Sequence, residues 1–177
     1  VFCEIDALTY HMSLDSIKKM YSDKVKAIVY PHLFGYMSET KEIIEFCKEK
    51  QIAFIEDAAQ SLGASLHGVK AGSIGDISTL SFNANKVIAG IAGGGAVCTN
   101  DKEQARLCKR LRKHGENKIL GYNSKMLLMN AEFINFRLNR MKEWQKMRQE
   151  IAKQYDEQLR EYVTCLLYTS PSPRDAT

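Results

Sequence analysis

Short apolar runs alternate with helical patterns over residues 1–115, and this alternation limits the possible fold more than any other feature of the sequence. Residues 25–35 open with a β-branched run typical of a buried strand, and residues 52–58 predict a second strand. Between them, residues 39–50 carry apolar side chains at helical spacing. Two further strands are predicted at 76–82 and 95–100. Strands separated by helices indicate an α/β architecture, with a mainly parallel sheet sandwiched by helices.

The boundaries of this region follow from the same patterns. Residues 1–6 read as a strand. Ser38 is expected to cap the helix at 39–50, and Asn100 is expected to cap a basic helix at 101–115.

The chain changes character after residue 115. Residues 116–126 are loop-like, and residues 127–162 predict helices, of which the last is long and highly charged. Its apolar residues recur at three- and four-residue spacing: Met141, Trp144, Met147, Ile151 and Tyr155. Such a stripe needs an apolar partner. Beyond about residue 164 the composition changes again, and residues 164–177 look like a non-native tail.

Composition excludes several classes of function. The net charge is only +4, and the most basic stretch, residues 106–118, contains no aromatic side chains to stack on bases, so a solvated helix end is favoured over a nucleic-acid surface. The sequence contains no apolar run of about 18 residues, so no membrane-spanning segment is expected. The five cysteines form no CxxC pair and lie at no zinc-like spacing from histidine. We therefore expect a cytoplasmic protein without a metal site.

The glycine-rich stretch "LSFNANKVIAGIAGGGAVCTND", residues 80–101, places Lys86 before its glycines. A P-loop requires the lysine after the glycines and a helix to follow, whereas a strand is predicted here. A dinucleotide-binding loop requires GxGxxG, which "GIAGGG" does not match. Both common types of phosphate loop are therefore excluded by the order of the residues.

Asp57 lies at the carboxyl end of the strand predicted at 52–58, the edge at which ligands bind to open α/β sheets. Taken alone, an aspartate in this place is more often a helix cap. Gln60 follows three residues later.

Three segments in order carry a more specific signal: "IEDAAQSLGA" (55–64), "GSIGDISTLSFNANK" (72–86) and "GGGAVCTND" (93–101). Together they resemble the DegT/DnrJ/EryC1/StrS family of pyridoxal-phosphate sugar aminotransferases, which have the aspartate aminotransferase fold (fold type I). The resemblance extends over about residues 1–162.

The resemblance implies a role for five residues. Lys86 matches the lysine that forms the Schiff base with pyridoxal 5'-phosphate, and Asp57 matches the carboxylate that faces the pyridine nitrogen. Gln60 matches a residue near the ring and its 3-hydroxyl, and Ser81 a hydroxyl donor to the phosphate. Asn123 matches a residue that reaches the cofactor phosphate of the neighbouring subunit in a homodimer.

The resemblance also implies a domain organisation. Residues 1–122 correspond to part of the cofactor-binding large domain, and residues 123–163 to an interface loop and a long helix toward a small domain. Read this way, the chain is an internal fragment, and it is expected to be inactive alone. Lys125 stands where the family more often has arginine, a change that keeps the charge but loses a bidentate fork.

The implied reaction is transfer of an amino group, with glutamate as donor, to a keto group of a nucleotide-linked deoxysugar in amino-sugar or cell-surface polysaccharide biosynthesis. Two alternatives remain open. One is a sugar dehydratase on the same scaffold, although such enzymes typically have histidine in place of the lysine at position 86. The other is a regulatory protein that binds the cofactor without turnover.

Overall fold

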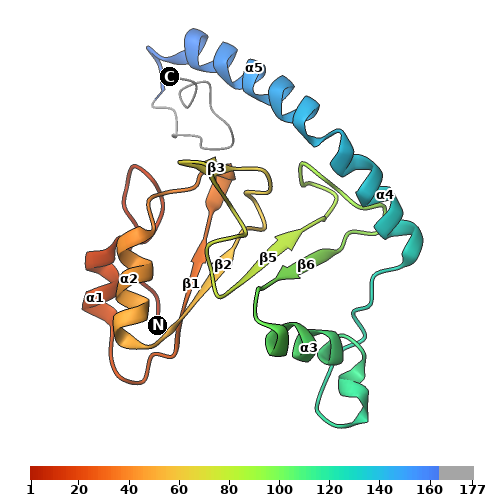
Figure 1. The fold of residues 1–177 in the computed structure, drawn as a ribbon. Helices are drawn as coiled ribbons and strands as arrows, with labels where there is room; N and C mark the ends of the chain where they lie inside the picture. The colour runs from red at the N-terminus through yellow and green to blue at the C-terminus, as the bar shows by residue number, and fades with distance from the viewer. Residues whose placement is uncertain (164–177) are drawn as a thin grey trace.

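The computed structural model describes residues 1–163, and its centre is a four-stranded sheet of order β1-β2-β5-β6 (Figure 1). Strands β1 (Ala27–Pro31), β2 (Ala53–Asp57) and β5 (Ile77–Ser81) are parallel, and β6 (Gly95–Cys98) pairs antiparallel with β5. The predicted mainly parallel sheet is therefore confirmed. The predicted tail at 164–177 lies outside the described residues.

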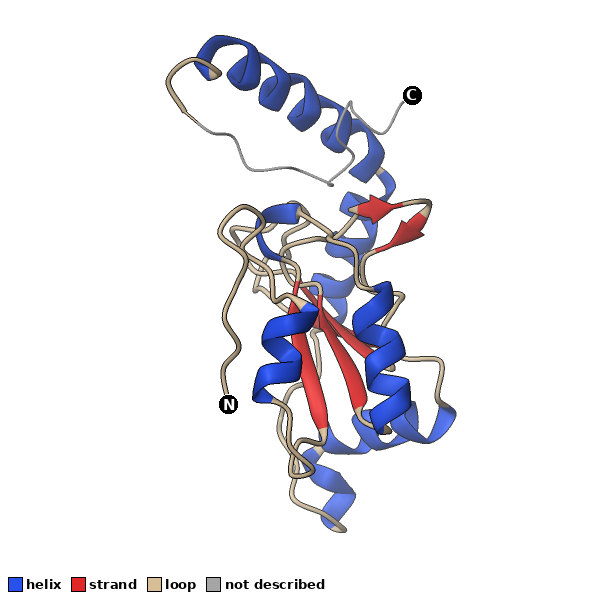
Figure 2. Cartoon of the chain, turned by 90° about the vertical axis from the view of Figure 1, so that its left-hand side faces the viewer, coloured by secondary structure: helices blue, strands red, loops and turns tan. Residues whose placement is uncertain are grey.

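Helices α1 (Leu14–Met20) and α2 (Lys41–Lys50) lie together on one face of the sheet (Figure 2). The remaining elements are the 3-10 turns η1 (Leu33–Gly35) and η2 (His114–Asn117), the hairpin β3 (Ser65–Leu66) and β4 (Val69–Lys70), and helices α3 (Lys102–Leu111), α4 (Leu128–Asn139) and α5 (Met141–Leu159).

The main core lies between α2 and the sheet. Alternate residues of the strands point into it, so Ile28, Tyr30 and Phe54 are buried against Ile43 and Phe46 of α2. The other face of β1 is open, and Val29 is 57% exposed. A second core cluster forms where the loop after β5 meets the helices, and its buried members are Phe82, Ile88 and Ile134.

Residues 1–6 were predicted to be a strand, and this prediction is wrong. Only Ile5 pairs, in an isolated bridge with Met12. The side chain of Asp6 instead accepts hydrogen bonds from the N–H groups of Leu8 and Thr9, so it closes a turn. A strand also needs a partner strand along its length, and within the described residues no strand pairs with residues 1–6.

Both predicted helix caps are wrong. Helix α2 begins after Thr40, whose side chain makes no capping hydrogen bond, and the Ser38 hydroxyl instead meets the buried Tyr30 hydroxyl. Helix α3 is capped by Asp101, one residue later than predicted, because its carboxylate accepts two backbone N–H groups of the first turn. It ends at Leu111, short of residue 115.

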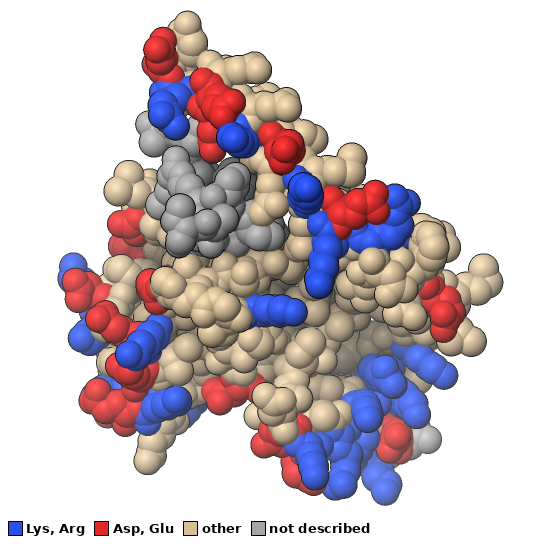
Figure 3. All heavy atoms as spheres, turned by 45° about the horizontal axis from the view of Figure 1, so that its top comes forward, with Lys and Arg blue, Asp and Glu red and all other residues tan. Residues whose placement is uncertain are grey.

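Lys and Arg side chains gather over α3 and η2 (Figure 3). No residue of α3 is buried, and two of its arginines form surface ion pairs, Arg106 with Glu103 and Arg110 with Glu116. This helix is solvated in the described structure.

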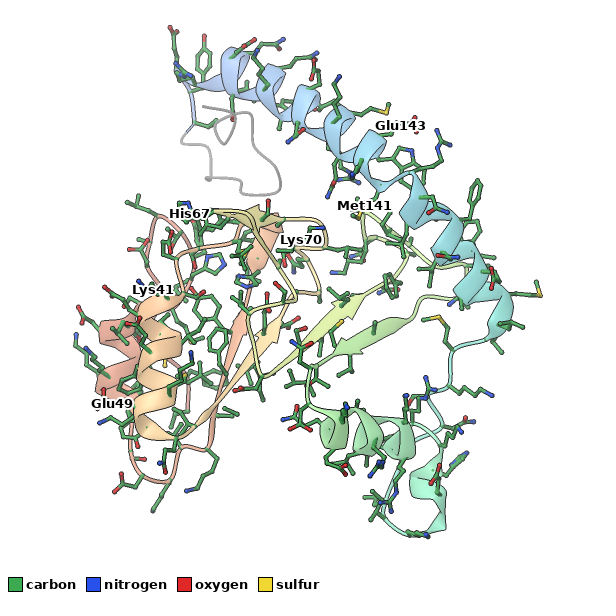
Figure 4. All side chains as sticks on the ribbon, in the orientation of Figure 1. Lys41, Glu49, His67, Lys70, Met141 and Glu143 are labelled. Atoms are coloured by element: carbon green, nitrogen blue, oxygen red, sulfur yellow. The ribbon has the colours of Figure 1, made fainter. Side chains whose placement is uncertain are left out.

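Helices α4 and α5 meet at Arg140 and form an arm that reaches past the sheet (Figure 1). The guanidinium carbons of Arg137 and Arg140 lie 4.8 and 5.3 Å from the centre of the Trp144 ring, which braces the junction. Met141 lies on the side of the arm toward the sheet and packs on the second core cluster, whereas Glu143 points away (Figure 4).

The outer half of the α5 stripe has no cover among residues 1–163. Met147, Ile151 and Tyr155 are each more than half exposed. No helix in this part of the chain combines the length and the apolar character needed to cross a membrane.

Candidate active site

The carboxyl ends of the three parallel strands meet at one edge of the sheet, and the predicted site residues of β2 and β5 lie there. Pro31 at the end of β1 is in register with Asp57, and Asp57 is in register with Thr79 of β5. Ser81 ends β5 at the same edge.

Asp57 is half-buried, and within residues 1–163 only one of its two carboxylate oxygens accepts hydrogen bonds. Its Oδ1 accepts the N–H of Ala59 at 3.1 Å and the Thr79 hydroxyl at 3.3 Å. Its Oδ2 has no hydrogen-bond partner among residues 1–163. Sequence reasoning missed Thr79, although a hydroxyl on the neighbouring strand was a usable signal once the register was known.

Gln60 is exposed in the loop after β2, and its orientation is fixed by the loop after β1. The N–H of Phe34 donates to Gln60 Oε1 at 3.0 Å. The side-chain Nε2 is therefore left to donate to something else.

Lys86 lies in the turn that leaves β5. Its N–H donates to the Asn83 carbonyl at 3.0 Å, and the Asn83 N–H donates to the Ser81 hydroxyl at 3.3 Å. The side chain of Lys86 is half-buried. Within the described part of the chain, its amine has neither a hydrogen-bond partner nor an ion-pair partner.

The glycine turn behind Lys86 is fastened to α4 by Asn130, a buried residue that the sequence did not single out. The Asn130 Nδ2 donates to the Gly93 carbonyl at 2.7 Å, and its Oδ1 accepts the N–H of Ala92 at 3.3 Å. Gly93 has a φ of 71°, which favours glycine. Gly90 closes the loop by donating to the Phe82 carbonyl at 2.8 Å.

Substitution of Gly90 by alanine is expected to destabilise this turn. A Cβ at this position would overlap the Gly93 carbonyl oxygen and the Asn130 side chain. We expect a loss of about 2 kcal/mol in the free energy of unfolding, measured by chemical denaturation. Gly68→Ala is the control, because Gly68 has open space and only its φ of 78° opposes a side chain, at a cost of about 1 kcal/mol. A larger loss for Gly68→Ala than for Gly90→Ala would contradict this reading of the turn.

Asn123 lies away from the other four predicted site residues. It pairs with Lys113 in an isolated bridge beside η2, and it is exposed. No hydrogen bond of residues 1–163 joins it to the sheet edge.

Glu56 and His32 form a buried pair beside the site that the sequence analysis missed. His32 Nε2 lies 3.1 Å from Glu56 Oε1, and neither side chain is exposed. The N–H groups of Gly72, Ile74 and Gly75 donate to the same carboxylate, which fastens the turn before β5 to β2. Burial acts to raise the pKa of Glu56, but the hydrogen bonds from His32, Gly72 and Ile74 outweigh it, and the pKa lies below its ordinary value. An acid on the buried face of an apolar strand was the available signal.

An apolar cavity of about 570 Å³ lies against β1, and Asp57 is among the residues that line it. Tyr10, Pro31 and Leu33 also line it, whereas Lys86, Gln60 and Ser81 do not. The residues that the structure describes contain no cluster of three or more His, Cys, Asp or Glu placed to hold a metal ion.

Comparison with known proteins decides the family. Residues 1–176 match the DegT/DnrJ/EryC1/StrS aminotransferase family. The chain belongs to this family. The resemblance to this family seen in the sequence is therefore confirmed.

Two curated relatives and one solved structure illustrate the match. A "Pleiotropic regulatory protein" of Geobacillus stearothermophilus is 33% identical over 96% of this chain and 47% of its own length. A dTDP-4-dehydro-2,3,6-trideoxy-D-glucose 4-aminotransferase of Saccharopolyspora spinosa is 31% identical over 94% and 48%. The aminotransferase structure from Psychrobacter cryohalolentis is 29% identical, with a TM-score of 0.87 over 92% of this chain and 45% of that one. The chain spans about half the length of the curated relatives it matches.

The expected cofactor of the family, pyridoxal phosphate, is confirmed by the family match and by a solved structure of a relative 26% identical to this chain. The side chains at the sheet edge fit such a group. Asp57 offers a free carboxylate oxygen, Lys86 offers a free amine, and Gln60 and Ser81 offer neutral hydrogen-bond donors. A ring nitrogen, a carbonyl and a phosphate would each find a chemically suitable partner among them.

Proposed function

We propose that this chain forms part of an aminotransferase that moves an amino group from glutamate to a keto group of a nucleotide-linked deoxysugar. The observation that supports it most is the half-buried amine of Lys86, which lacks protein partners and lies on the loop leaving the sheet edge that ends in Asp57. The name of the Saccharopolyspora spinosa relative supports the substrate class. A role in cytoplasmic amino-sugar or cell-surface polysaccharide biosynthesis follows from this proposal.

Lys86 and Asp57 are proposed to carry the chemistry. When bound, pyridoxal phosphate supplies a carbonyl that reacts with amines and a ring that accepts electrons. The Lys86 amine would hold the cofactor covalently and would carry a proton to and from the substrate carbon. Asp57 Oδ2 would accept a hydrogen bond from the protonated ring nitrogen, while Ala59 and Thr79 hold Oδ1 in place.

Three further residues are proposed to bind the cofactor. Because the N–H of Phe34 occupies Gln60 Oε1, Gln60 Nε2 is free to donate to the oxygen on the ring. The Ser81 hydroxyl donates to the phosphate. Asn123 reaches the phosphate of a second subunit in a homodimer, and its exposed position away from this sheet edge supports that role.

The test is the first half of the reaction, measured in the natural protein that carries this chain. After loading with pyridoxal phosphate, addition of L-glutamate is expected to replace the visible absorption band with the ultraviolet band of the aminated cofactor. D-glutamate is the matched control and should leave the visible band unchanged. A visible band that persists with L-glutamate would argue against the proposed reaction.

A protein that binds the cofactor without turnover is a second candidate, favoured by the name of the Geobacillus stearothermophilus relative. The same experiment separates the two, since such a protein would show the visible band and no conversion. A dehydratase is disfavoured, because the resemblance gives those enzymes histidine where this chain has Lys86.

A further inference from the structure

Two aromatic side chains stand together beside the site without being buried. The rings of Tyr10 and Phe34 pack edge to face, with 6.3 Å between their centres and an angle of 86° between their planes. Tyr10 is 42% exposed and Phe34 is 51% exposed. About half of the surface of each residue is therefore open to solvent.

Both residues have a left-handed backbone conformation, with φ of 59° for Tyr10 and 57° for Phe34. Large side chains rarely adopt this conformation, because the Cβ crowds the backbone. Strain of this kind persists only where the surroundings enforce it, and it concentrates at functional sites. The contact between two half-exposed rings stabilises the fold too little to account for backbone strain at both positions.

A network of hydrogen bonds enforces the two conformations. The N–H of Tyr10 donates to the Asp6 carbonyl at 2.8 Å. His11 Nδ1 pairs with the Thr9 carbonyl at 2.7 Å, and His11 Nε2 accepts the N–H of Leu33 at 3.3 Å. Burial lowers the pKa of His11, which keeps the ring neutral and able to accept. The loops that carry the two aromatic rings are therefore tied to each other.

The pair borders the site on two sides. The backbone N–H of Phe34 holds Gln60, and Tyr10 lines the same cavity as Asp57. Tyr10 thus lines a mostly apolar cavity that contains few polar groups, as small-molecule sites usually do, and the Phe34 ring packs on Tyr10.

We propose that Tyr10 and Phe34 form the subsite for the sugar ring of the nucleotide-linked substrate. This inference rests on the function proposed above. In that reaction the carbon that receives the amine belongs to the sugar. Gln60 is proposed to donate to the ring oxygen, which neighbours the carbonyl group of the cofactor, so the aromatic pair beside Gln60 meets the sugar rather than the nucleotide. A deoxysugar presents a face of C–H groups, which packs well on an aromatic ring.

The test uses Phe34→Gly in the natural protein loaded with pyridoxal phosphate. Glycine adopts the φ of position 34 without strain, so the melting temperature should stay within about 2 °C of wild type or rise. Calorimetric titration with two probes, dTDP-glucose and dTDP, measures binding. We expect the affinity for dTDP-glucose to fall about tenfold while the affinity for dTDP is unchanged. Tyr10→Gly should likewise lower the affinity for dTDP-glucose and leave the melting temperature equal or higher.

Gln51→Gly is the matched control. Gln51 ends α2 with a φ of 55°, and it is exposed and makes no contact with the site. Its replacement should leave the melting temperature equal or higher, and both affinities unchanged.

Four outcomes would overturn the subsite. A fall of more than about 5 °C in the melting temperature with unchanged affinities would make the rings structural. An equal loss of affinity for both probes would assign them to the nucleotide. Capture of pyridoxal phosphate by Lys86, measured on the same sample, together with unchanged dTDP-glucose binding would sink this inference alone. Absence of that capture would sink the proposed function, and the subsite with it.

Discussion

Replacement of Lys86 by alanine is expected to abolish covalent capture of pyridoxal phosphate. The amine is the nucleophile in the proposed chemistry, and alanine provides none. The measurement is incubation with the cofactor, reduction with borohydride, and mass spectrometry of the digested protein. In the wild type we expect the label on the peptide that contains Lys86, and in Lys86→Ala we expect label on no peptide above background.

Two variants sharpen this experiment. Lys86→Arg keeps the positive charge but cannot form the covalent bond, so it should lose the label as alanine does. Lys70→Ala removes an exposed lysine from β4 and should leave the label on Lys86 unchanged. Labelling that is spread over surface lysines and survives in Lys86→Ala would show that the amine has no special reactivity.

Glu56→Gln is expected to lower the free energy of unfolding by about 3 kcal/mol. Glutamine cannot accept all the hydrogen bonds that the buried Glu56 carboxylate accepts, and each buried donor left without an acceptor costs about 1–3 kcal/mol. Here the change also places an amide N–H₂ group against backbone N–H groups that need an acceptor, those of Gly72, Ile74 and Gly75. Glu49→Gln, which alters an exposed pair with Lys50, should stay within about 0.5 kcal/mol of wild type.

The pH dependence of the same pair gives an independent check. The folded-state pKa of Glu56 lies below its ordinary value of 4.5, so its contribution is fully present above that value. It is lost as the pH falls through the lower, folded-state pKa. The stability gap between wild type and Glu56→Gln should therefore be widest near neutral pH and narrow in acid. A gap that widens in acid would contradict the assignment of an ionised Glu56.

The strands of the sheet were predictable because the pattern of apolar and polar residues within each strand already shows which side chains are buried. Tyr30 and Phe54 alternate with residues of the other face, and apolar β-branched runs surround them. The hairpin β3–β4 was missed because each strand has only two residues. Residues 1–6 were over-predicted for the opposite reason, since a strand-like run forms a strand only where another strand pairs with it.

The site was predictable only in part. Asp57 and Lys86 stood out through a resemblance, but their surroundings depend on contacts between distant parts of the chain. Thr79 reaches Asp57 through the register of two strands, and His32 reaches Glu56 across 24 positions. No local pattern encodes such pairings, because each residue taken alone is an ordinary member of its own segment.

The two hydrogen bonds that Asn130 makes to the glycine turn have a mechanical consequence. Helix α4 is joined through the braced Trp144 junction to α5, whose outer half carries the exposed Met147, Ile151 and Tyr155. The arm thus connects the glycine turn behind Lys86, held by α4, to the exposed apolar side chains of the outer half of α5. Any tilt of this arm is therefore transmitted through Asn130 to the backbone of Ala92 and Gly93, in the turn that follows Lys86.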